Sequence, residues 1–275
     1  MTNQLELIAF NQQNAATALI VYLQSQNIAA QLVKRTKQQD FLVVLNDATD
    51  RDSAVAITKH FVAHPSDPKY QLAGSSIVAP LFGIQAFKQT PFTWFIVLLC
   101  AVVYVMQNAG LQVWVEQQFR ILPLHVIAHY GQWWRVISPS LIHFSELHII
   151  LNLLVWWQIG RLIEFRLGSV SLITVFLLTS IISNIAQLQV SGTGFGGLSG
   201  VVYGVIGFAW FCGLLRPMLG IKLPGHFVAF AIAWLVLGYT DVLWIKLANT
   251  AHTGGLIAGG LAALCLVWFV KPKQR

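Results

Sequence analysis

The chain has 275 residues, of which 56% are hydrophobic and only 10% carry a charge, and its mean hydropathy is +0.66. These values exclude an ordinary water-soluble domain, in which about 25% of residues are charged. The net charge of +7 does not call for a nucleic-acid partner, because most basic residues beyond residue 85 flank apolar segments, as membrane topology requires.

The first 66 residues are more polar than the rest and predict a small α+β domain. Short strand-like runs alternate there with segments that have helical apolar spacing and polar starts. A linker that contains several proline, glycine and serine residues is expected over residues 67–90. We expect strands over residues 5–10, 28–35 and 41–45, and helices over residues 14–27 and 50–64.

Two histidines in this first domain have the spacing of metal ligands. His60 and His64 lie four residues apart on one predicted helix. No further ligand is near them in the sequence, so we interpret the pair as a partly exposed helix face and expect no metal site.

Residues 91–271 predict an all-α, polytopic membrane domain. Most of its six apolar segments approach the ~20 residues that a helix needs to cross a bilayer. The fourth segment is short and follows glycines, so we expect it to begin below the membrane surface. Segment 110–146, with Trp114, Trp133 and Trp134, suits a loop in the interfacial zone. The six spans are expected over residues 92–109, 147–163, 169–190, 199–215, 226–244 and 250–270.

The basic residues of this domain predict its orientation. If the six spans alternate in direction, one side collects most of the lysines and arginines, and the positive-inside rule places both termini in the cytoplasm. The cytoplasmic side receives Lys88, Arg161, Arg166, Arg216, Lys222, Lys271, Lys273 and Arg275, and the other side receives Arg120, Arg135 and Lys246.

The same topology brings several polar side chains to one depth. Spans two, four and six all run from outside to inside, and each has polar residues near its first turns. Polar groups inside a membrane are costly, so they face the interior of a helix bundle or a cavity that contains water. The residues concerned are His148, Asn152, Ser199 and His252.

These residue types suit acyl transfer. A serine hydroxyl becomes a strong nucleophile when a base accepts its proton, and histidine is the usual base. No Asp or Glu lies within spans four or six, so we expect a dyad of Ser199 and His252 without a carboxylate. Tyr203 lies one turn after Ser199 and is expected to stack beside the imidazole, although an ordinary bundle tyrosine is the alternative.

The reaction also needs donors for an oxyanion. We expect them from the Ser199 amide, at the positive end of a helix, and from the side chains of His148 and Asn152. Taken singly, these two side chains are also common as hydrogen-bonding residues between helices. Gly255 and Gly259 lie four apart, a pattern that allows two helices to approach closely.

Taken together, the motifs GLSGVVYG, AHTGGLIAGG, HFSELHIILNLL and WWRVIS resemble those of rhomboid intramembrane serine proteases, in particular the bacterial GlpG type. The resemblance covers essentially the whole chain. It implies a six-helix rhomboid bundle with a cytoplasmic N-terminal domain, located in the bacterial inner membrane. It implies a serine endopeptidase that cleaves transmembrane or juxtamembrane segments of membrane proteins without a metal or other cofactor.

Carried over by residue, the resemblance implies that Ser199 is the nucleophile and His252 the general base, with His148 and Asn152 lining the oxyanion hole. Pro139 departs from some members of the type, which have a histidine there. Further residues are implied to have supporting roles: Tyr203, Gly197, Gly255 and Gly259 at the substrate site, Trp134 and Arg135 in the first loop, Glu164 and Arg166 in the structure, and Phe230 and Trp234 on a gate formed by the fifth span.

Two other functions are compatible with parts of this pattern. A non-catalytic rhomboid-like binder would typically lack the serine or the histidine, and both are present here. A small transporter would normally show charges deep in its spans or repeated halves, and neither is found. The partners expected are the lipid bilayer and membrane-protein substrates. The oligomeric state is not specified by the sequence.

Overall fold

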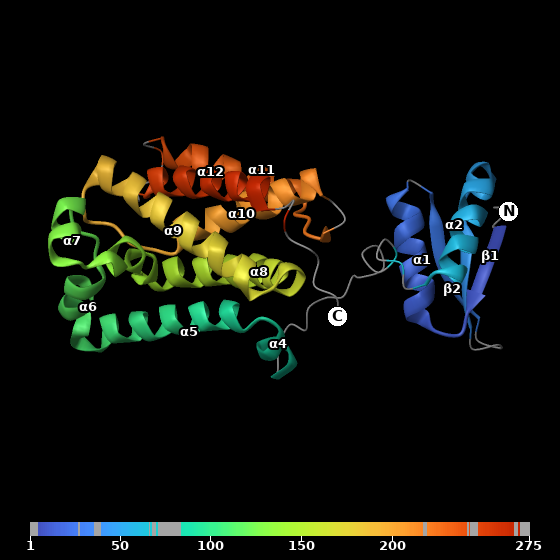
Figure 1. The fold of residues 1–275 in the computed structure, drawn as a ribbon, viewed down its shortest axis with the longest axis horizontal. Coiled ribbons are helices and arrows are strands. Elements are labelled where there is room, and N and C mark those ends of the chain that lie inside the picture. The colour runs from blue at the N-terminus through green and yellow to red at the C-terminus, as the bar shows by residue number, and fades with distance from the viewer. Residues whose placement is uncertain are drawn as a thin grey trace. The chain divides into compact units, whose positions relative to one another are not determined.

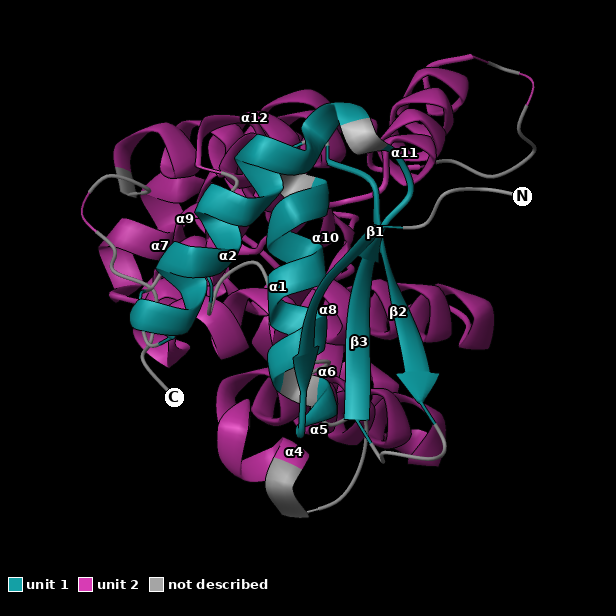
Figure 2. Cartoon of the chain, turned by 90° about the vertical axis from the view of Figure 1, so that its right-hand side faces the viewer, with its two compact units in different colours: residues 1–78 teal, residues 79–275 magenta. Residues whose placement is uncertain are grey.

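The computed structural model describes residues 5–26, 28–35, 40–65, 67, 70, 84–216, 219–240, 242, 247–266 and 269. The chain forms two compact units, residues 1–78 and residues 79–275, which Figure 2 shows in different colours. The linker expected over residues 67–90 lies largely outside the described residues.

The first unit contains a three-stranded antiparallel sheet in the order β1-β3-β2. Helix α1 packs against all three strands, and α2 packs against α1 and β1. Leu19, Leu23, Val43 and Leu45 form part of the buried core. The predicted α+β domain is therefore confirmed. Its elements are β1 (Leu5–Phe10), α1 (Gln13–Ser25), β2 (Ala30–Arg35), β3 (Asp40–Leu45) and α2 (Arg51–Ala63).

The second unit is helical, and the six predicted apolar segments correspond to six of its helices (Figure 1). On length and composition alone, two helical stretches among the described residues could cross a membrane, Pro91–Phe119 and Ser169–Ser191. The six helices are α5 (Pro91–Met106), α8 (Glu146–Leu167), α9 (Ser169–Ser191), α10 (Ser199–Leu215), α11 (Gly225–Gly238) and α12 (Asn249–Leu266).

The region between α5 and α8 is more ordered than a simple loop. It contains a π-helical turn and several short helices, held together by Arg135, which is only 5% exposed. The guanidinium of Arg135 donates to the carbonyls of Gln117 and Arg120 at 2.8 and 3.0 Å. These elements are η2 (Gln107–Leu111), α6 (Gln112–Phe119), α7 (Leu124–Tyr130), η3 (Trp133–Val136) and η4 (Ser138–Leu141), and α4 (Ile84–Gln89) precedes α5.

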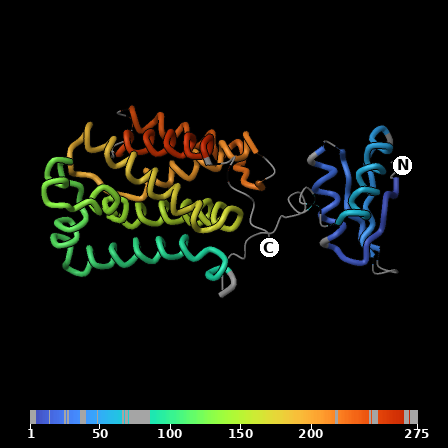
Figure 3. Tube along the Cα trace, viewed as in Figure 1, coloured from blue at the N-terminus to red at the C-terminus, as the bar shows by residue number. Residues whose placement is uncertain are grey.

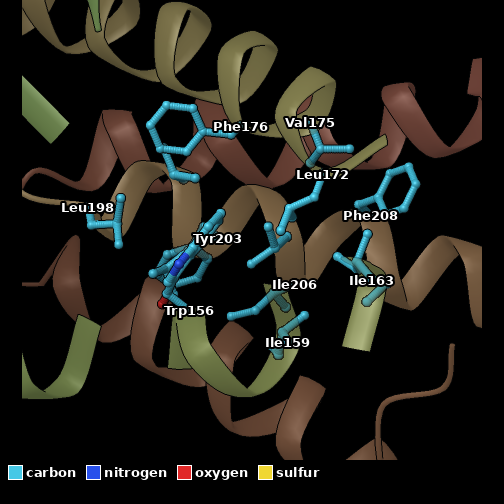
Figure 4. Close-up of a cluster of buried hydrophobic side chains, with 14 of the residues drawn as sticks. Trp156, Ile159, Ile163, Leu172, Val175, Phe176, Leu198, Tyr203, Ile206 and Phe208 are labelled. Carbon is cyan, nitrogen blue, oxygen red and sulfur yellow. The ribbon is translucent and has the colours of Figure 1, made fainter. Parts of the chain in front are cut away.

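Helix α10 lies at the centre of the bundle. Most of its residues are buried, as expected of a helix that is apolar on all sides. It packs against α8, α9, α11 and α12. Figure 4 shows part of this core, in which side chains of α8, α9 and α10 form one buried cluster that includes Trp156, Ile163, Val175, Phe176 and Ile206.

Helices α10 and α12 run side by side with their backbones in contact (Figure 3). A Cβ atom on Gly255 would lie 1.9 Å from the carbonyl oxygen of Gly200, and one on Gly259 would lie 1.9 Å from that of Gly204. Only glycine permits this separation, which brings the first turns of the two helices together.

A buried carboxylate ties the start of α5 to the junction of α8 and α9. Glu164 is fully buried and accepts hydrogen bonds from the amides of Phe92 and Thr93 at 2.8 and 2.7 Å. It also accepts from the hydroxyls of Thr93 and Ser169, each at 2.6 Å. These bonds satisfy amides at a helix start that have no partner within the helix, so Glu164 has a structural role.

Candidate active site

Ser199 and His252 are in direct contact. Ser199 is the first residue of α10, and His252 lies in the first turn of α12. The distance between Ser199 Oγ and His252 Nε2 is 2.8 Å, and His252 is only 5% exposed. A hydroxyl and an imidazole at hydrogen-bonding distance are the arrangement that serine nucleophiles require.

The His252 ring is oriented by stacking. Tyr203, one turn after Ser199 on α10, lies against it with ring centroids 4.8 Å apart and planes 19° from parallel. The Tyr203 hydroxyl donates to the carbonyl of Ala231 on α11 at 3.0 Å, so this ring is itself fixed. His252 Nδ1 has no hydrogen-bond partner among the described residues, and therefore no carboxylate there completes a triad.

Helix α12 is also capped at its start. Gln187 on α9 accepts a hydrogen bond from the amide of Ala251, the residue before His252, at 2.8 Å. The side chain of Gln187 donates in turn to Ser191 Oγ at 2.7 Å. Because the first amides of a helix have no partner within it, this contact satisfies one of them and fixes the turn that carries His252.

His148 approaches Ser199 from α8 across Gly197. A Cβ atom on Gly197 would lie 2.7 Å from His148 Nε2 and 3.7 Å from Ser199 Oγ, and the φ angle of Gly197 is +131°. Both the space and the backbone conformation therefore require glycine at this position. Asn152 is buried on α8, and its side-chain amide donates to the carbonyl of His148 at 3.0 Å. The structure thus brings His148 to the dyad, and it shows Asn152 bonded within its own helix.

A residue that the sequence analysis did not single out, His143, holds the segment before Ser199. His143 is 1% exposed; its Nε2 accepts from the Leu198 amide at 3.4 Å, and its Nδ1 lies 3.2 Å from the Leu141 carbonyl. These contacts define a neutral ring with the proton on Nδ1. Burial, and secondly the neighbouring His148 ring, lower the pKa of His143 to about 3, which agrees with that state. In the sequence, His143 is the first residue of the HFSELHIILNLL motif and lies five residues before His148.

Two other pairs of residues considered in the sequence analysis lie outside this site, one pair on α11 and one pair in the first unit. Phe230 and Trp234 are stacked on the surface of α11, 65% and 38% exposed, with ring centroids 6.2 Å apart. In the first unit, the rings of His60 and His64 lie 4.8 Å apart, and His60 Nδ1 is 2.9 Å from the Tyr70 hydroxyl. The described residues contain no cluster of three or more His, Cys, Asp or Glu side chains that could hold a metal ion.

Comparison with known proteins identifies relatives over both units. Residues 130–269 match the family described as the rhomboid domain, and residues 4–77 match the cytoplasmic N-terminal domain of rhomboid serine protease. Rhomboid protease GlpG of Klebsiella pneumoniae is 32% identical over 269 residues, which cover 93% of this chain and 94% of that protein. Rhomboid protease GlpG of Yersinia pestis is 31% identical over 283 residues, which cover 98% of both.

Proposed function

Because this chain belongs to the rhomboid family of intramembrane serine proteases, we propose that Ser199 is its nucleophile and His252 its general base. The enzyme is a multi-pass protein of the bacterial inner membrane. The observation that carries the proposal is the 2.8 Å distance between Ser199 Oγ and His252 Nε2.

The reaction follows from these positions. His252 Nε2 accepts the proton of Ser199 as Oγ forms a bond to the carbonyl carbon of the scissile peptide. His252 then donates that proton to the leaving nitrogen as the C–N bond breaks, which leaves an ester on Ser199. A water molecule loses a proton to His252, attacks the ester, and releases the carboxylic acid product while Ser199 regains its proton.

Three donors are suited to the negative oxygen that develops on the attacked carbonyl. The Ser199 amide lies at the start of α10, where the helix dipole favours negative charge. His148 lies against Gly197 beside Ser199 Oγ. The Asn152 amide completes the set after turning from the His148 carbonyl, a small rearrangement of the kind that often accompanies substrate binding.

We propose transmembrane or juxtamembrane segments of membrane proteins as substrates. The dyad lies in the first turns of two apolar helices, and the α11 surface beside them carries the exposed rings of Phe230 and Trp234. A helix inserted in the bilayer reaches this site by lateral movement past α11. On the basis of the lysine and arginine distribution, we place both termini of the chain in the cytoplasm.

The proposal is tested by cleavage of a membrane-protein substrate in reconstituted vesicles. Ser199→Ala and His252→Ala are expected to abolish turnover while the thermal unfolding of the protein stays close to that of wild type. Ser171→Ala on α9 and His129→Ala on α7 are the matched controls and are expected to retain activity. Cleavage by folded Ser199→Ala would contradict the assignment, and a phenotype that survives this substitution in cells would indicate a binder.

A further inference from the structure

Three buried polar side chains connect the region before α8 to α9. Ser140 in η4 is 1% exposed, Ser180 on α9 is fully buried, and Asn184 on α9 is 3% exposed. Ser140 Oγ lies 2.8 Å from Ser180 Oγ, and Asn184 Nδ2 donates to Ser140 Oγ at 3.1 Å. Among the described residues, no hydrogen bond joins any of the three to Ser199 or His252.

The hydrogen bonds of this cluster also reach the backbone of segment 136–140. Asn184 Nδ2 also donates to the Val136 carbonyl at 2.9 Å, and Ser180 Oγ donates to the Ile137 carbonyl at 3.4 Å. Ser140 Oγ accepts from Asn184, and in the contact between Ser140 and Ser180 either hydroxyl is able to donate. The α9 side chains therefore contact two backbone carbonyls and one hydroxyl of segment 136–140.

On its other side the same segment fixes the residues before Ser199. The carbonyl of Pro139 accepts a hydrogen bond from the Gly197 amide at 2.9 Å. A Cβ atom on Gly196 would lie 3.2 Å from this carbonyl oxygen and 2.9 Å from Ile142 Cβ, so the two backbone segments are closely packed. Gly197 in turn lies against the His148 ring and beside Ser199 Oγ, so a displacement of Gly197 is felt by both.

We infer that Ser140, Ser180 and Asn184 are positioning residues for proteolysis, which set the oxyanion side of the active site through Pro139 and Gly197. This inference rests on the proposed function. The cluster holds segment 136–140 against α9, the Pro139 carbonyl holds Gly197, and Gly197 keeps His148 and the Ser199 amide at the reacting carbonyl. Buried amides and hydroxyls are costly unless they are bonded, and here they bond to one another and to backbone carbonyls of segment 136–140.

The test measures kcat and KM for a membrane substrate with Asn184→Ala and with the milder Ser140→Ala and Ser180→Ala, on monodisperse folded protein well below its melting temperature. We expect Asn184→Ala to lower kcat about tenfold with KM nearly unchanged, because a displacement of ~1 Å at a reacting centre can cost on the order of 10²-fold. Ser171→Ala is the matched control and is expected to match wild type, since its buried hydroxyl on α9 bonds, among the described residues, only to the Leu167 carbonyl, at 3.0 Å.

A double-mutant cycle separates positioning from simple stability. In a His148→Ala background, adding Asn184→Ala should lower the rate of Ser199 labelling by a fluorophosphonate by a smaller factor than it does in the wild-type background, because His148, one of the two donors that the cluster positions, is already removed. Full additivity, an unchanged kcat in all three single variants, or losses that follow only the unfolded fraction would overturn the inference. If Ser199→Ala also cleaves, the proposed function fails instead, so the two failures are distinguishable.

Discussion

The interface between α10 and α12 and the attachment of α11 are built in different ways. Across the first, glycines bring two backbones into contact, and α10 is buried on most sides. Helix α11 buries only Val228, Ala231 and Leu235 among its 14 residues. The two regions therefore have different roles. Close backbone packing between α10 and α12 fixes the positions of Ser199 and His252, while the loosely packed α11 lies beside the path by which a substrate is proposed to enter.

Polar contacts supply much of what holds α11. The Tyr203 hydroxyl bonds to the Ala231 carbonyl, the Tyr239 hydroxyl lies 2.8 Å from Thr253 Oγ1, and Asn249 Nδ2 donates to the Gly238 carbonyl. Two of these contacts involve residues next to His252 in space or sequence, Tyr203 and Thr253. Hydrogen bonds between membrane helices contribute about 0.6 kcal/mol on average, so such contacts can be opened more easily than a packed glycine interface.

The largest effect is expected from breaking the glycine interface. Gly259→Val places a branched side chain where even Cβ would lie 1.9 Å from the Gly204 carbonyl oxygen. We expect a loss of about 3 kcal/mol or more in the free energy of unfolding, together with loss of activity, because α10 and α12 must separate. Thermal unfolding in detergent measures this loss. Gly254→Ala is the control, since its Cβ would make an ordinary 3.4 Å contact with Ala186, and equal melting of Gly259→Val and wild type would refute the interface argument.

The second prediction concerns the pH dependence of stability next to the dyad. The pKa of His143 is lowered to about 3 in the folded chain, whereas an exposed histidine in the unfolded chain titrates near 6.5. Between these values the unfolded chain binds more protons, so stability falls as the pH is lowered. From pH 7 to pH 5 we expect wild type to lose roughly 2 kcal/mol more than His143→Gln, measured by chemical unfolding. Parallel pH profiles would show that His143 is not held neutral.

The smallest effect is expected at α11. Tyr239→Phe removes the contact with Thr253 and should weaken the attachment of α11 by about 0.6 kcal/mol. We expect kcat/KM for a membrane substrate to rise about threefold, with labelling of Ser199 by a small fluorophosphonate unchanged. Thr253→Val should reproduce this result because it removes the other hydroxyl of the pair. A fall in both rates would mean that the contact orients His252 and does not restrain α11.

The sequence predicted those parts of the fold that depend on apolar periodicity. The three strands, the helices of the first unit and the six apolar helices of the second were expected near their observed positions. The fifth span is shorter than expected, because α11 ends at Gly238 and not at residue 244. Gly238 is packed so closely by Asn249 that Cβ would collide with it, and the chain turns immediately afterwards.

Backbone contacts explain most of what the sequence did not predict. Ser199 and His252 were predicted because a hydroxyl and an imidazole are unusual in apolar spans. The two side chains meet because each lies in the first turn of its helix, α10 or α12. The contact of Pro139 with Gly197 and that of His143 with Leu198 involve a carbonyl and an amide of irregular segments, which no periodicity reveals. Arg135 likewise orders segment 110–146 by hydrogen bonds to backbone carbonyls. Such bonds leave no periodic pattern in the sequence, and for this reason the segment was expected to be a loop.

The most direct measurement is the site of covalent labelling by a fluorophosphonate in the folded, membrane-embedded protein. Mass spectrometry of the digested adduct is expected to find the phosphonyl group on Ser199, and His252→Ala is expected to prevent its formation because the hydroxyl then has no base. Labelling at another serine, or none in protein that unfolds at the normal temperature, would contradict the assignment of Ser199 and His252 as the catalytic pair.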